Sequence, residues 1–198
     1  LNNALAAEAL RQGQADVALL SWPPMTSGEG LWMEPFARDG VAVIVHPGSS
    51  FSEIELTLLR EIFLGRLQET HGTILTVVSR EKGSGTRAAF ETLVLEGAEP
   101  SLNAVVMPSA EAMIDYVAGT PSAVGYASTG SVDGRVRALL LEGVLPTDAA
   151  ISSGRYPISR DLYLASAGEP TGEARQLAQW ILRNGSSIDS AVKGIVAR

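Results

Sequence analysis

Residues suited to binding chemistry concentrate in one stretch, Ser79 to Glu91, which combines basic side chains, hydroxyls and two glycines. The residue types predict a strand, a glycine turn and a helix start, because β-branched residues precede the turn and helix formers follow it. A helix N-terminus carries unpaired N–H groups and the positive end of a dipole, which suits an anion. The candidate contacts in the turn are Gly83, Ser84, Gly85 and Thr86. Arg80 adds a guanidinium that can hold a tetrahedral oxyanion through two parallel hydrogen bonds.

Spacing alone leaves a second interpretation of this stretch, a capped loop that binds nothing, because Ser and Thr begin helices of every kind. Enzymatic interpretations are weaker. The turn lacks the Gly-x-Ser-x-Gly form of a hydrolase nucleophile and the Lys-Ser/Thr pair of a nucleotide-binding loop. His46 and His71 lie in predicted loops without metal-ligand spacing, so no metal, cofactor or catalytic residue is expected. We therefore expect a binding protein and not an enzyme.

The composition is that of an ordinary globular chain, with 45% hydrophobic residues and a net charge of -7 that is spread along the sequence. This balance argues against a nucleic-acid or anionic-membrane partner, because both require a concentrated basic face. The absence of cysteine excludes disulfides and thiolate chemistry. No apolar run approaches the roughly 20 residues that span a bilayer, and no signal peptide is visible. The first residue, Leu1, predicts a processed or trimmed form.

Hydrophobic periodicity and turn residues predict strands that alternate with helices, which indicates an α/β fold with a mainly parallel sheet. Strands or extended segments are expected at residues 15–20, 40–45, 73–79, 104–107, 123–128, 135–141 and 155–165. Helices are expected at residues 3–12, capped by Asn3, and at 52–63, 86–95, 109–119, 172–182 and 188–196. Ser21 follows the first strand, at the carboxyl end where open α/β sheets place ligands. It is a further candidate contact, and a hydroxyl that only completes a turn is the alternative.

Four motifs, in order, resemble the periplasmic phosphate-binding proteins, the solute receptors of ABC transporters with a type II periplasmic-binding fold. Residues 80–87 with Phe90 are similar to the family signature, and residues 58–66 are similar to its Asp-Ile-Phe-x-Gly-Lys helix end. Residues 124–126 resemble the family's Ile-Gly-Tyr strand, and residues 156–164 resemble its Tyr-Pro-Leu-Ser-Arg-Pro-Leu-Tyr strand. Four matches in the same order across nearly the whole chain are more specific than any one of them.

The resemblance implies two α/β lobes joined by two crossover strands, with the anion held between them. Residues 48–150 would form one lobe, and residues 1–47 with 151–198 would form the other. By the family match, Arg80 would neutralise the charge of the anion and Ser84, Gly85 and Thr86 would donate hydrogen bonds, while Ser21 matches a serine on the opposite lobe. The implied partners are inorganic phosphate or another oxyanion and an ABC permease in the membrane, at a periplasmic or extracellular location.

Two departures from the family pattern matter. The family usually has an aspartate after the serine, and this chain has Trp22. An acceptor-only carboxylate rejects fully deprotonated anions such as sulfate, so its loss weakens the expected selectivity for phosphate. The family also begins with a strand and helix whose first turn supplies contacts, and nothing before Ala15 predicts that strand. We therefore expect either a fragment of a longer protein or a member that has lost part of one lobe.

The leading hypothesis from the sequence is an extracytoplasmic binding protein, or a domain of one, for phosphate or a similar tetrahedral oxyanion. The alternative is a non-transporting sensory or interaction domain of the same fold, whose anion site is degenerate. An enzyme that acts on a phosphate ester comes third, because the sequence names no base for it.

Overall fold

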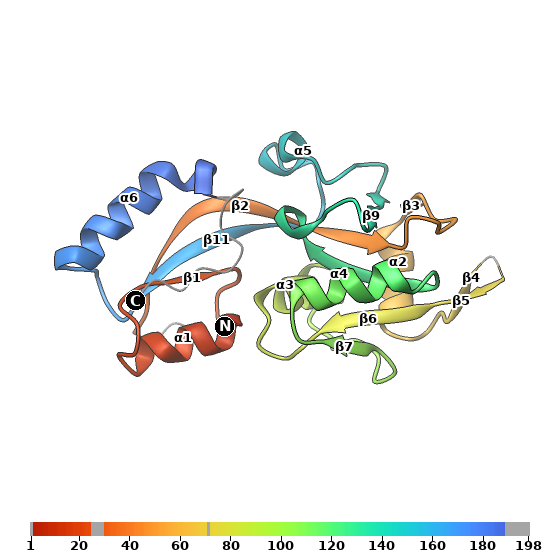
Figure 1. The fold of residues 1–198 in the computed structure, drawn as a ribbon, viewed down its shortest axis with the longest axis horizontal. Helices are drawn as coiled ribbons and strands as arrows, with labels where there is room; N and C mark the ends of the chain where they lie inside the picture. The colour runs from red at the N-terminus through yellow and green to blue at the C-terminus, as the bar shows by residue number, and fades with distance from the viewer. Residues whose placement is uncertain (1, 25–29, 71, 189–198) are drawn as a thin grey trace. The chain divides into compact units, whose positions relative to one another are not determined.

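The computed structural model describes residues 2–24, 30–70 and 72–188. Contacts divide the chain into two compact units, which are described separately here (Figure 1). Unit 1 comprises residues 1–39, 83–85 and 160–198, and unit 2 comprises residues 40–82 and 86–159. The chain passes between the units inside β2 (Trp32–Val45) and at the start of β11 (Ser159–Ser166). The lobe boundaries expected from the sequence, after residues 47 and 150, remain a prediction.

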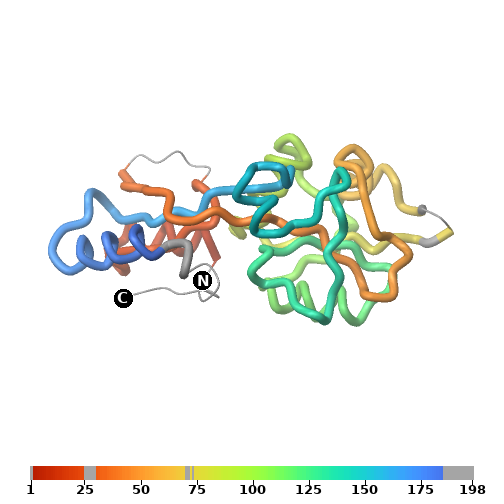
Figure 2. The backbone as a smooth tube through the Cα atoms, turned by 90° about the horizontal axis from the view of Figure 1, so that it is seen from above, coloured from red at the N-terminus to blue at the C-terminus, as the bar shows by residue number. Residues whose placement is uncertain are grey.

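Unit 1 is built from both ends of the chain. β1 (Ala18–Leu20) pairs antiparallel with β11, and the sheet order β1-β11-β2 places β11 between β1 and β2. Figure 2 shows these N-terminal and C-terminal segments side by side. Two helices accompany the sheet, α1 (Asn3–Arg11) and α6 (Gly172–Ile188).

Different helices cover the two faces of the unit 1 sheet, because successive strand residues point to opposite sides. Leu20 of β1 belongs to one buried cluster with Leu10 of α1. Leu164 of β11 belongs to another with Ile181 of α6. Cover on both faces explains why the first strand has no polar alternation in the sequence.

A buried ion pair joins β2 and β11 at the edge of unit 1. Asp39 and Arg160 have side chains that are each 2% exposed, and Arg160 Nη2 lies 2.8 Å from Asp39 Oδ2. Arg160 Nε donates to the same oxygen at 3.2 Å. A charge inside a protein is tolerated only when it is paired, so this contact fixes the two strands against each other where they leave unit 1.

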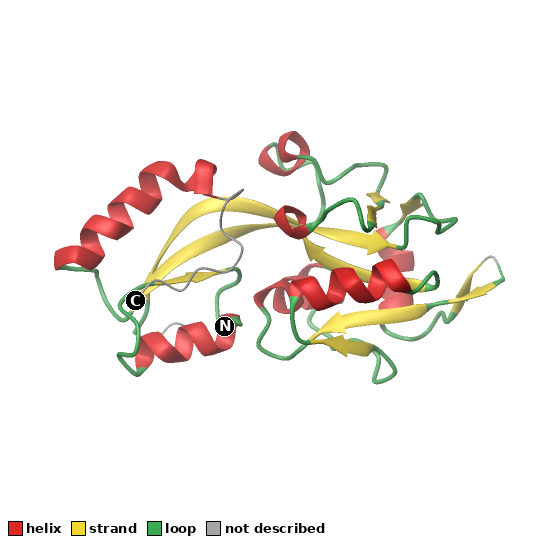
Figure 3. Ribbon diagram, viewed as in Figure 1, coloured by secondary structure: helices red, strands yellow, loops and turns green. Residues whose placement is uncertain are grey.

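Unit 2 alternates short strands with helices (Figure 3). Its strands are β3 (Glu53–Ile54), β4 (Glu69–Thr70), β5 (Thr73–Ile74), β6 (Thr76–Arg80), β7 (Val105–Met107), β8 (Ala123–Ser128), β9 (Arg137–Ala138) and β10 (Leu140–Leu141). Its helices are α2 (Leu56–Phe63), α3 (Gly85–Leu93), α4 (Ala110–Gly119) and α5 (Asp148–Ser152), with a short 3-10 helix, η1 (Thr129–Ser131). β6 pairs in parallel with β7 and β8, while β8 pairs antiparallel with β2.

Close packing on both faces of β8 fixes the unit 2 sheet. A Cβ on Gly125 would lie 2.6 Å from Met113 Sδ, so a residue without a side chain is required where α4 approaches β8. On the opposite face, Tyr126 stacks on Phe90 of α3 with ring centroids 4.1 Å apart. Phe63 of α2 lies 4.6 Å from Phe90, measured between centroids. These three aromatic rings anchor α2 and α3 to the strand that carries the Val-Gly-Tyr motif.

The expected α/β class is confirmed, and four local predictions need correction. The helix expected at residues 52–63 begins only at Leu56, because Glu53 and Ile54 form β3 and pair with β10. Asn2, not Asn3, caps α1, because the Asn2 side chain accepts a hydrogen bond from Leu5 N. β2 begins at Trp32, well before the predicted start at residue 40, since its first half is a strand of unit 1. The short helix α5 was not predicted. The helix expected at 188–196 lies outside the described residues, apart from its first residue.

Candidate anion-binding site

The segment after β6 has the strand-turn-helix order that the sequence predicts. β6 ends at Arg80, and α3 begins at Gly85, one residue before the predicted start. Gly83 has a φ of +90°, a backbone conformation that residues with a side chain rarely adopt. Ser84 and Thr86 are buried, with exposed fractions of 4% and 8%. The turn therefore encloses its two hydroxyl groups.

Arg80 enters the site already paired with a carboxylate. Its side chain is 12% exposed, and its Nε and Nη2 donate to the two carboxylate oxygens of Glu81 at 2.9 and 3.1 Å. A bound anion must share this guanidinium with Glu81 or displace it. Lys82 is held by Glu99 at 2.9 Å, and this hydrogen bond lowers the pKa of the Glu99 carboxyl below its ordinary value.

Arg87 fixes the turn from the helix side, a role that the sequence-based prediction missed. Its Nη1 donates to the carbonyl oxygen of Arg80 at 2.9 Å, and its Nε donates to Glu91 at 2.6 Å. The arginine is buried, so these charge-assisted bonds are shielded from water. The spacing of four residues between Arg87 and Glu91 predicts their ion pair on a helix, but it gives no sign of the bond to Arg80.

Tyr126 supports the end of β6 from the neighbouring strand. Its hydroxyl accepts a hydrogen bond from Arg80 N at 3.2 Å and lies 2.8 Å from Ser79 Oγ. Burial raises the pKa of Tyr126 above its ordinary value, and the hydrogen bonds with Ser79 and Arg80 act in the opposite direction. Tyr126 therefore stays neutral at physiological pH and positions the strand end without adding charge.

Residues 83–85 belong by their contacts to unit 1, together with the start of α1 and Ser21. Ala4 N donates to the carbonyl oxygen of Gly83 at 3.0 Å. A Cβ on Gly85 would overlap Ser21 Oγ and would lie 2.8 Å from Asn3 Oδ1. Two of the predicted contacts, Ser21 and Gly85, are thus brought together, and only glycine permits the approach.

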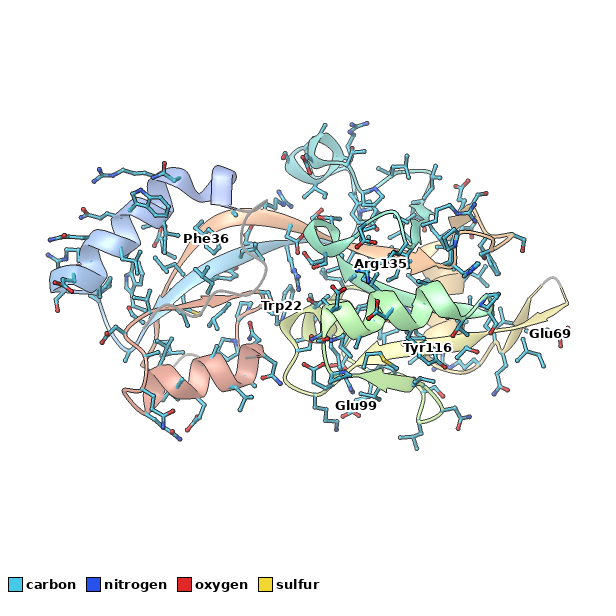
Figure 4. All side chains as sticks on the ribbon, viewed as in Figure 1. Trp22, Phe36, Glu69, Glu99, Tyr116 and Arg135 are labelled. Atoms are coloured by element: carbon cyan, nitrogen blue, oxygen red, sulfur yellow. The ribbon has the colours of Figure 1, made fainter. Side chains whose placement is uncertain are left out.

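Asn3 organises the turn after β1. Its Oδ1 accepts from Ser21 N at 2.8 Å and from Trp22 N at 3.3 Å, while its Nδ2 donates to the carbonyl oxygen of Trp22 at 2.9 Å. Figure 4 labels Trp22, whose backbone forms two of these three hydrogen bonds. This use of Asn3 could not be predicted, because asparagine at a helix start is typical of a cap.

The start of α1 contacts residues 83–85, and all of these residues belong to unit 1. α1 and α3 are nine residues each, and their first residues lie close through the contacts of residues 3 and 4 with residues 83 and 85. Each N-terminus carries about half a positive charge. Among the described residues, neither helix has an acidic side chain in its first turn. A helix N-terminus without an acidic side chain beside it suits a bound anion.

The structure offers no comparable support for metal chemistry. Within residues 2–24, 30–70 and 72–188, no group of three histidine, aspartate or glutamate side chains could hold a metal ion. His46 Nδ1 accepts from Gly48 N at 2.9 Å within its own turn, and His71 lies outside the described residues. In the same ranges, no helix is both long and apolar enough to cross a bilayer.

Comparison with known proteins gives matches over most of the chain. A profile described as a PBP superfamily domain matches residues 5–184. The phosphate-binding protein PstS of Bacillus subtilis is 33% identical over 148 residues, which is 72% of this chain and 49% of that protein. The chain spans about half the length of this curated relative.

Two solved structures are similar over nearly the whole chain. A Clostridium perfringens protein with bound phosphate, described as a phosphate ABC transporter substrate-binding protein, superposes with a TM-score of 0.87 at 25% identity. The match covers 96% of this chain and 82% of that one. An ABC-type phosphate transport receptor from Vibrio cholerae gives a TM-score of 0.76 at 26% identity, with coverages of 99% and 85%. The type II periplasmic-binding fold expected from the sequence is confirmed by these matches.

Proposed function

The chain belongs to the PBP superfamily, and on this premise we propose that it binds phosphate or a similar tetrahedral oxyanion as an extracytoplasmic solute-binding protein or a domain of one. The observation that carries the proposal is the glycine turn at Gly83 and Gly85, which contacts the start of α1 within unit 1 and is not flanked by an acidic residue in the first turn of α1 or α3. Such a site suits a compact anion, because N–H groups and dipoles supply positive potential from a rigid frame.

The ligand contacts that we propose are the residues singled out from the sequence. Backbone N–H groups at the start of α3 and the hydroxyls of Ser84 and Thr86 would donate to the anion, and Gly83 and Gly85 would permit its close approach. Arg80 would supply formal charge, and Ser21 would add a hydroxyl from the turn after β1. Arg87, Tyr126 and Asn3 would hold these groups in place without contacting the ligand.

The transport role rests on the named relatives. The B. subtilis relative is a phosphate-binding protein, and the two similar structures are a phosphate ABC transporter substrate-binding protein and a phosphate transport receptor. We propose that this chain likewise presents an anion to an ABC permease from a periplasmic or extracellular location. Two lobes, residues 48–150 and residues 1–47 with 151–198, would close on the ligand, and no chemical reaction would follow.

A sensory or interaction domain is the second candidate, and two observations favour it. Trp22 stands where the family usually has a proton-accepting aspartate, and the Arg80 guanidinium is already paired with Glu81. A site that no longer holds an anion would retain both features. This candidate predicts that replacing Arg80 leaves ligand behaviour unchanged.

Titration calorimetry with phosphate, sulfate and molybdate separates the two candidates. Under the transport proposal phosphate binds, and Arg80→Ala weakens binding at least about tenfold, since hydrogen bonds to a charged group are the strongest available. Arg66→Ala is the matched control, because Arg66 is 64% exposed and also pairs with a glutamate. Absence of binding by all three anions would overturn the proposal.

The Trp22→Asp variant tests selectivity in the same assay. A carboxylate at this position accepts a hydrogen bond from the P–OH group of hydrogen phosphate and repels sulfate, so the ratio of phosphate affinity to sulfate affinity should rise. If the ratio does not change, residue 22 does not face the anion and the family comparison does not extend to this side of the site.

A further inference from the structure

We propose that unit 2 carries a second binding pocket, separate from the anion site, for a small molecule with an apolar body and a carboxylate. The pocket is a cavity of about 310 Å³. Its lining residues are Val45, Gly48, Ser49, Ser50, Phe51, Ile54, Ile62, Leu75, Pro121, Ser122, Ala123, Val124 and Leu139. This volume lies at the lower end of the range for small-molecule sites.

The cavity lies at the opposite end of the strands from the proposed anion site. Leu75 directly precedes β6 and Ala123 is the first residue of β8, and both line the cavity. Arg80 is the last residue of β6, and the two strands run in parallel. A ligand in the cavity therefore does not share contacts with residues 80–86.

The lining itself selects for an apolar body. Most of its side chains are aliphatic or aromatic, and none of them is charged. Three serines supply hydroxyls, and Ser122 Oγ lies 3.0 Å from Thr76 Oγ1. Ser49 and Ser50 lie on one connecting segment, so they gather their polar groups on one wall. A molecule with a polar end and a hydrocarbon body matches this division.

A partly buried cation, Arg137, stands behind the serine wall. Arg137 pairs with Val45 across β9 and β2, and residues two apart on a strand share a face, so Arg137 is on the same side as Val45 and Leu139. Both of these neighbours line the cavity. Arg137 Nη2 donates to the carbonyl oxygens of Ser49, at 2.6 Å, and Phe51. The guanidinium is therefore packed against the segment that forms the polar wall.

The charge of Arg137 has no balancing carboxylate among the described residues. Its Nε atom is buried without a hydrogen-bond partner there, while the residue as a whole is partly exposed. A partly buried charge without a carboxylate partner is stabilised when an anionic group binds nearby. This second observation, independent of the cavity, makes the polar end of the ligand a carboxylate. The apolar lining excludes a strongly hydrated dianion such as phosphate.

Chemical-shift titration of the labelled protein with butanoate, hexanoate and hexanamide tests the pocket. Hexanoate should move the amide signals of Ser49, Ser50, Ser122 and Ala123 and leave those of Ser84 and Thr86 in place. Each added methylene should tighten binding about fourfold, which makes hexanoate roughly fifteenfold tighter than butanoate. Hexanamide should bind at least about tenfold more weakly than hexanoate, because it lacks the charge.

Two kinds of variant sharpen the test. Arg137→Met should weaken hexanoate binding to the level of hexanamide, and Arg137→Lys should retain most of it. Since Arg137 also holds residues 49 and 51, Ser50→Trp provides a variant at an exposed lining position that fills the cavity without touching the arginine. Equal binding of hexanoate and hexanamide, full binding by Ser50→Trp, or shifts confined to residues 80–86 would each overturn the proposal. These outcomes are independent of phosphate binding, so the two proposals fail separately.

Discussion

Two turns supply the residues of the proposed anion site, and they are stabilised in different ways. The turn after β6 is held by several elements at once, since Arg87 of α3 and Tyr126 of β8 both bond the backbone of Arg80. The turn after β1 depends on one side chain, the amide of Asn3, which makes three hydrogen bonds to Ser21 and Trp22.

This difference follows the division expected from the sequence, in which the β6 turn resembles the family pattern and Trp22 departs from it. The β6 turn is supported by buried groups within unit 2, so its geometry does not depend on which residue follows Ser21. Asn3 holds the β1 turn through backbone atoms of Trp22. The geometry of this turn therefore does not require a particular side chain at position 22. Substitutions at the supporting residues can show whether the two turns contribute unequally to stability and binding.

The largest effect is expected for Arg87→Ala, which removes the support of the β6 turn. The change leaves the Arg80 carbonyl and the Glu91 carboxylate without this donor in a buried setting, so unfolding should become about 3 kcal/mol easier. Anion affinity should fall as well, because the turn loses its attachment to α3. Urea denaturation and phosphate titration measure the two effects.

Arg60→Ala is the matched control for this substitution. Arg60 also belongs to unit 2, donates to the Val94 carbonyl at 2.7 Å and pairs with Glu96 at 2.9 Å. Its loss should reduce stability and leave anion affinity intact. If both variants weaken phosphate binding equally, the effect of Arg87 is general destabilisation and not support of the turn.

A somewhat smaller effect is expected for Asn3→Ala in the β1 turn. Three hydrogen bonds of partly buried groups are lost, which should destabilise the protein by about 2 kcal/mol. Asn3→Asp keeps an acceptor for Ser21 N and Trp22 N, so it should recover stability. The added negative charge near Gly85 should nonetheless weaken anion binding. Equal phosphate affinity in Asn3→Asp and wild type would place the anion away from this turn.

The contrast between the turns also explains what could be predicted from the sequence. The glycine turn after β6 was predictable, because Gly83 and the helix start are local signals that need no knowledge of distant residues. The α/β class followed in the same way from alternating strand and helix patterns. The position of Ser21 after a strand and the family resemblance both predicted a ligand contact, but neither predicted that Ser21 lies against Gly85.

The supporting residues could not be predicted, since their roles arise from tertiary contacts. Asn3 has the sequence context of a helix cap, and its true partners lie 18 and 19 residues away. Tyr126 was noted only as part of a strand motif, although its hydroxyl meets Arg80 46 residues away in sequence. The early start of β2 has the same cause, because pairing in unit 1 extends a segment that shows no regular alternation.

The stability that Tyr126 contributes to the β6 turn should depend on pH. Since the pKa of Tyr126 is raised in the folded state, the unfolded chain releases this proton first as the pH rises above about 10. The contribution of neutral Tyr126 to the free energy of unfolding is therefore present below about pH 10 and is lost as the pH rises further. Tyr126→Phe should reduce stability by about 1 kcal/mol at neutral pH, because Ser79 and Arg80 N lose a partner, and it should flatten this alkaline loss.

Denaturation midpoints at pH 8 to 11 measure the alkaline effect. Tyr156 is the natural control, because burial also raises the pKa of its hydroxyl, which donates to the Val41 carbonyl away from the turn. Tyr156→Phe should flatten the alkaline loss and leave phosphate affinity unchanged. An alkaline profile that is identical in wild type and Tyr126→Phe would contradict the assignment.

The smallest effect is expected for Arg135→Ala, which tests whether burial or the number of bonds makes Arg87 important. Arg135 lies over α4 (Figure 4) and contacts Glu111, Asp115 and Asp133 at 2.8, 2.5 and 2.7 Å, so it has more carboxylate partners within 3 Å than Arg87. Its side chain is 41% exposed, and water and salt screen its charge. The thermal midpoint should shift by less than about 2 °C, and by still less in 1 M salt. A loss as large as that of Arg87→Ala would mean that bond count, and not burial, stabilises the β6 turn.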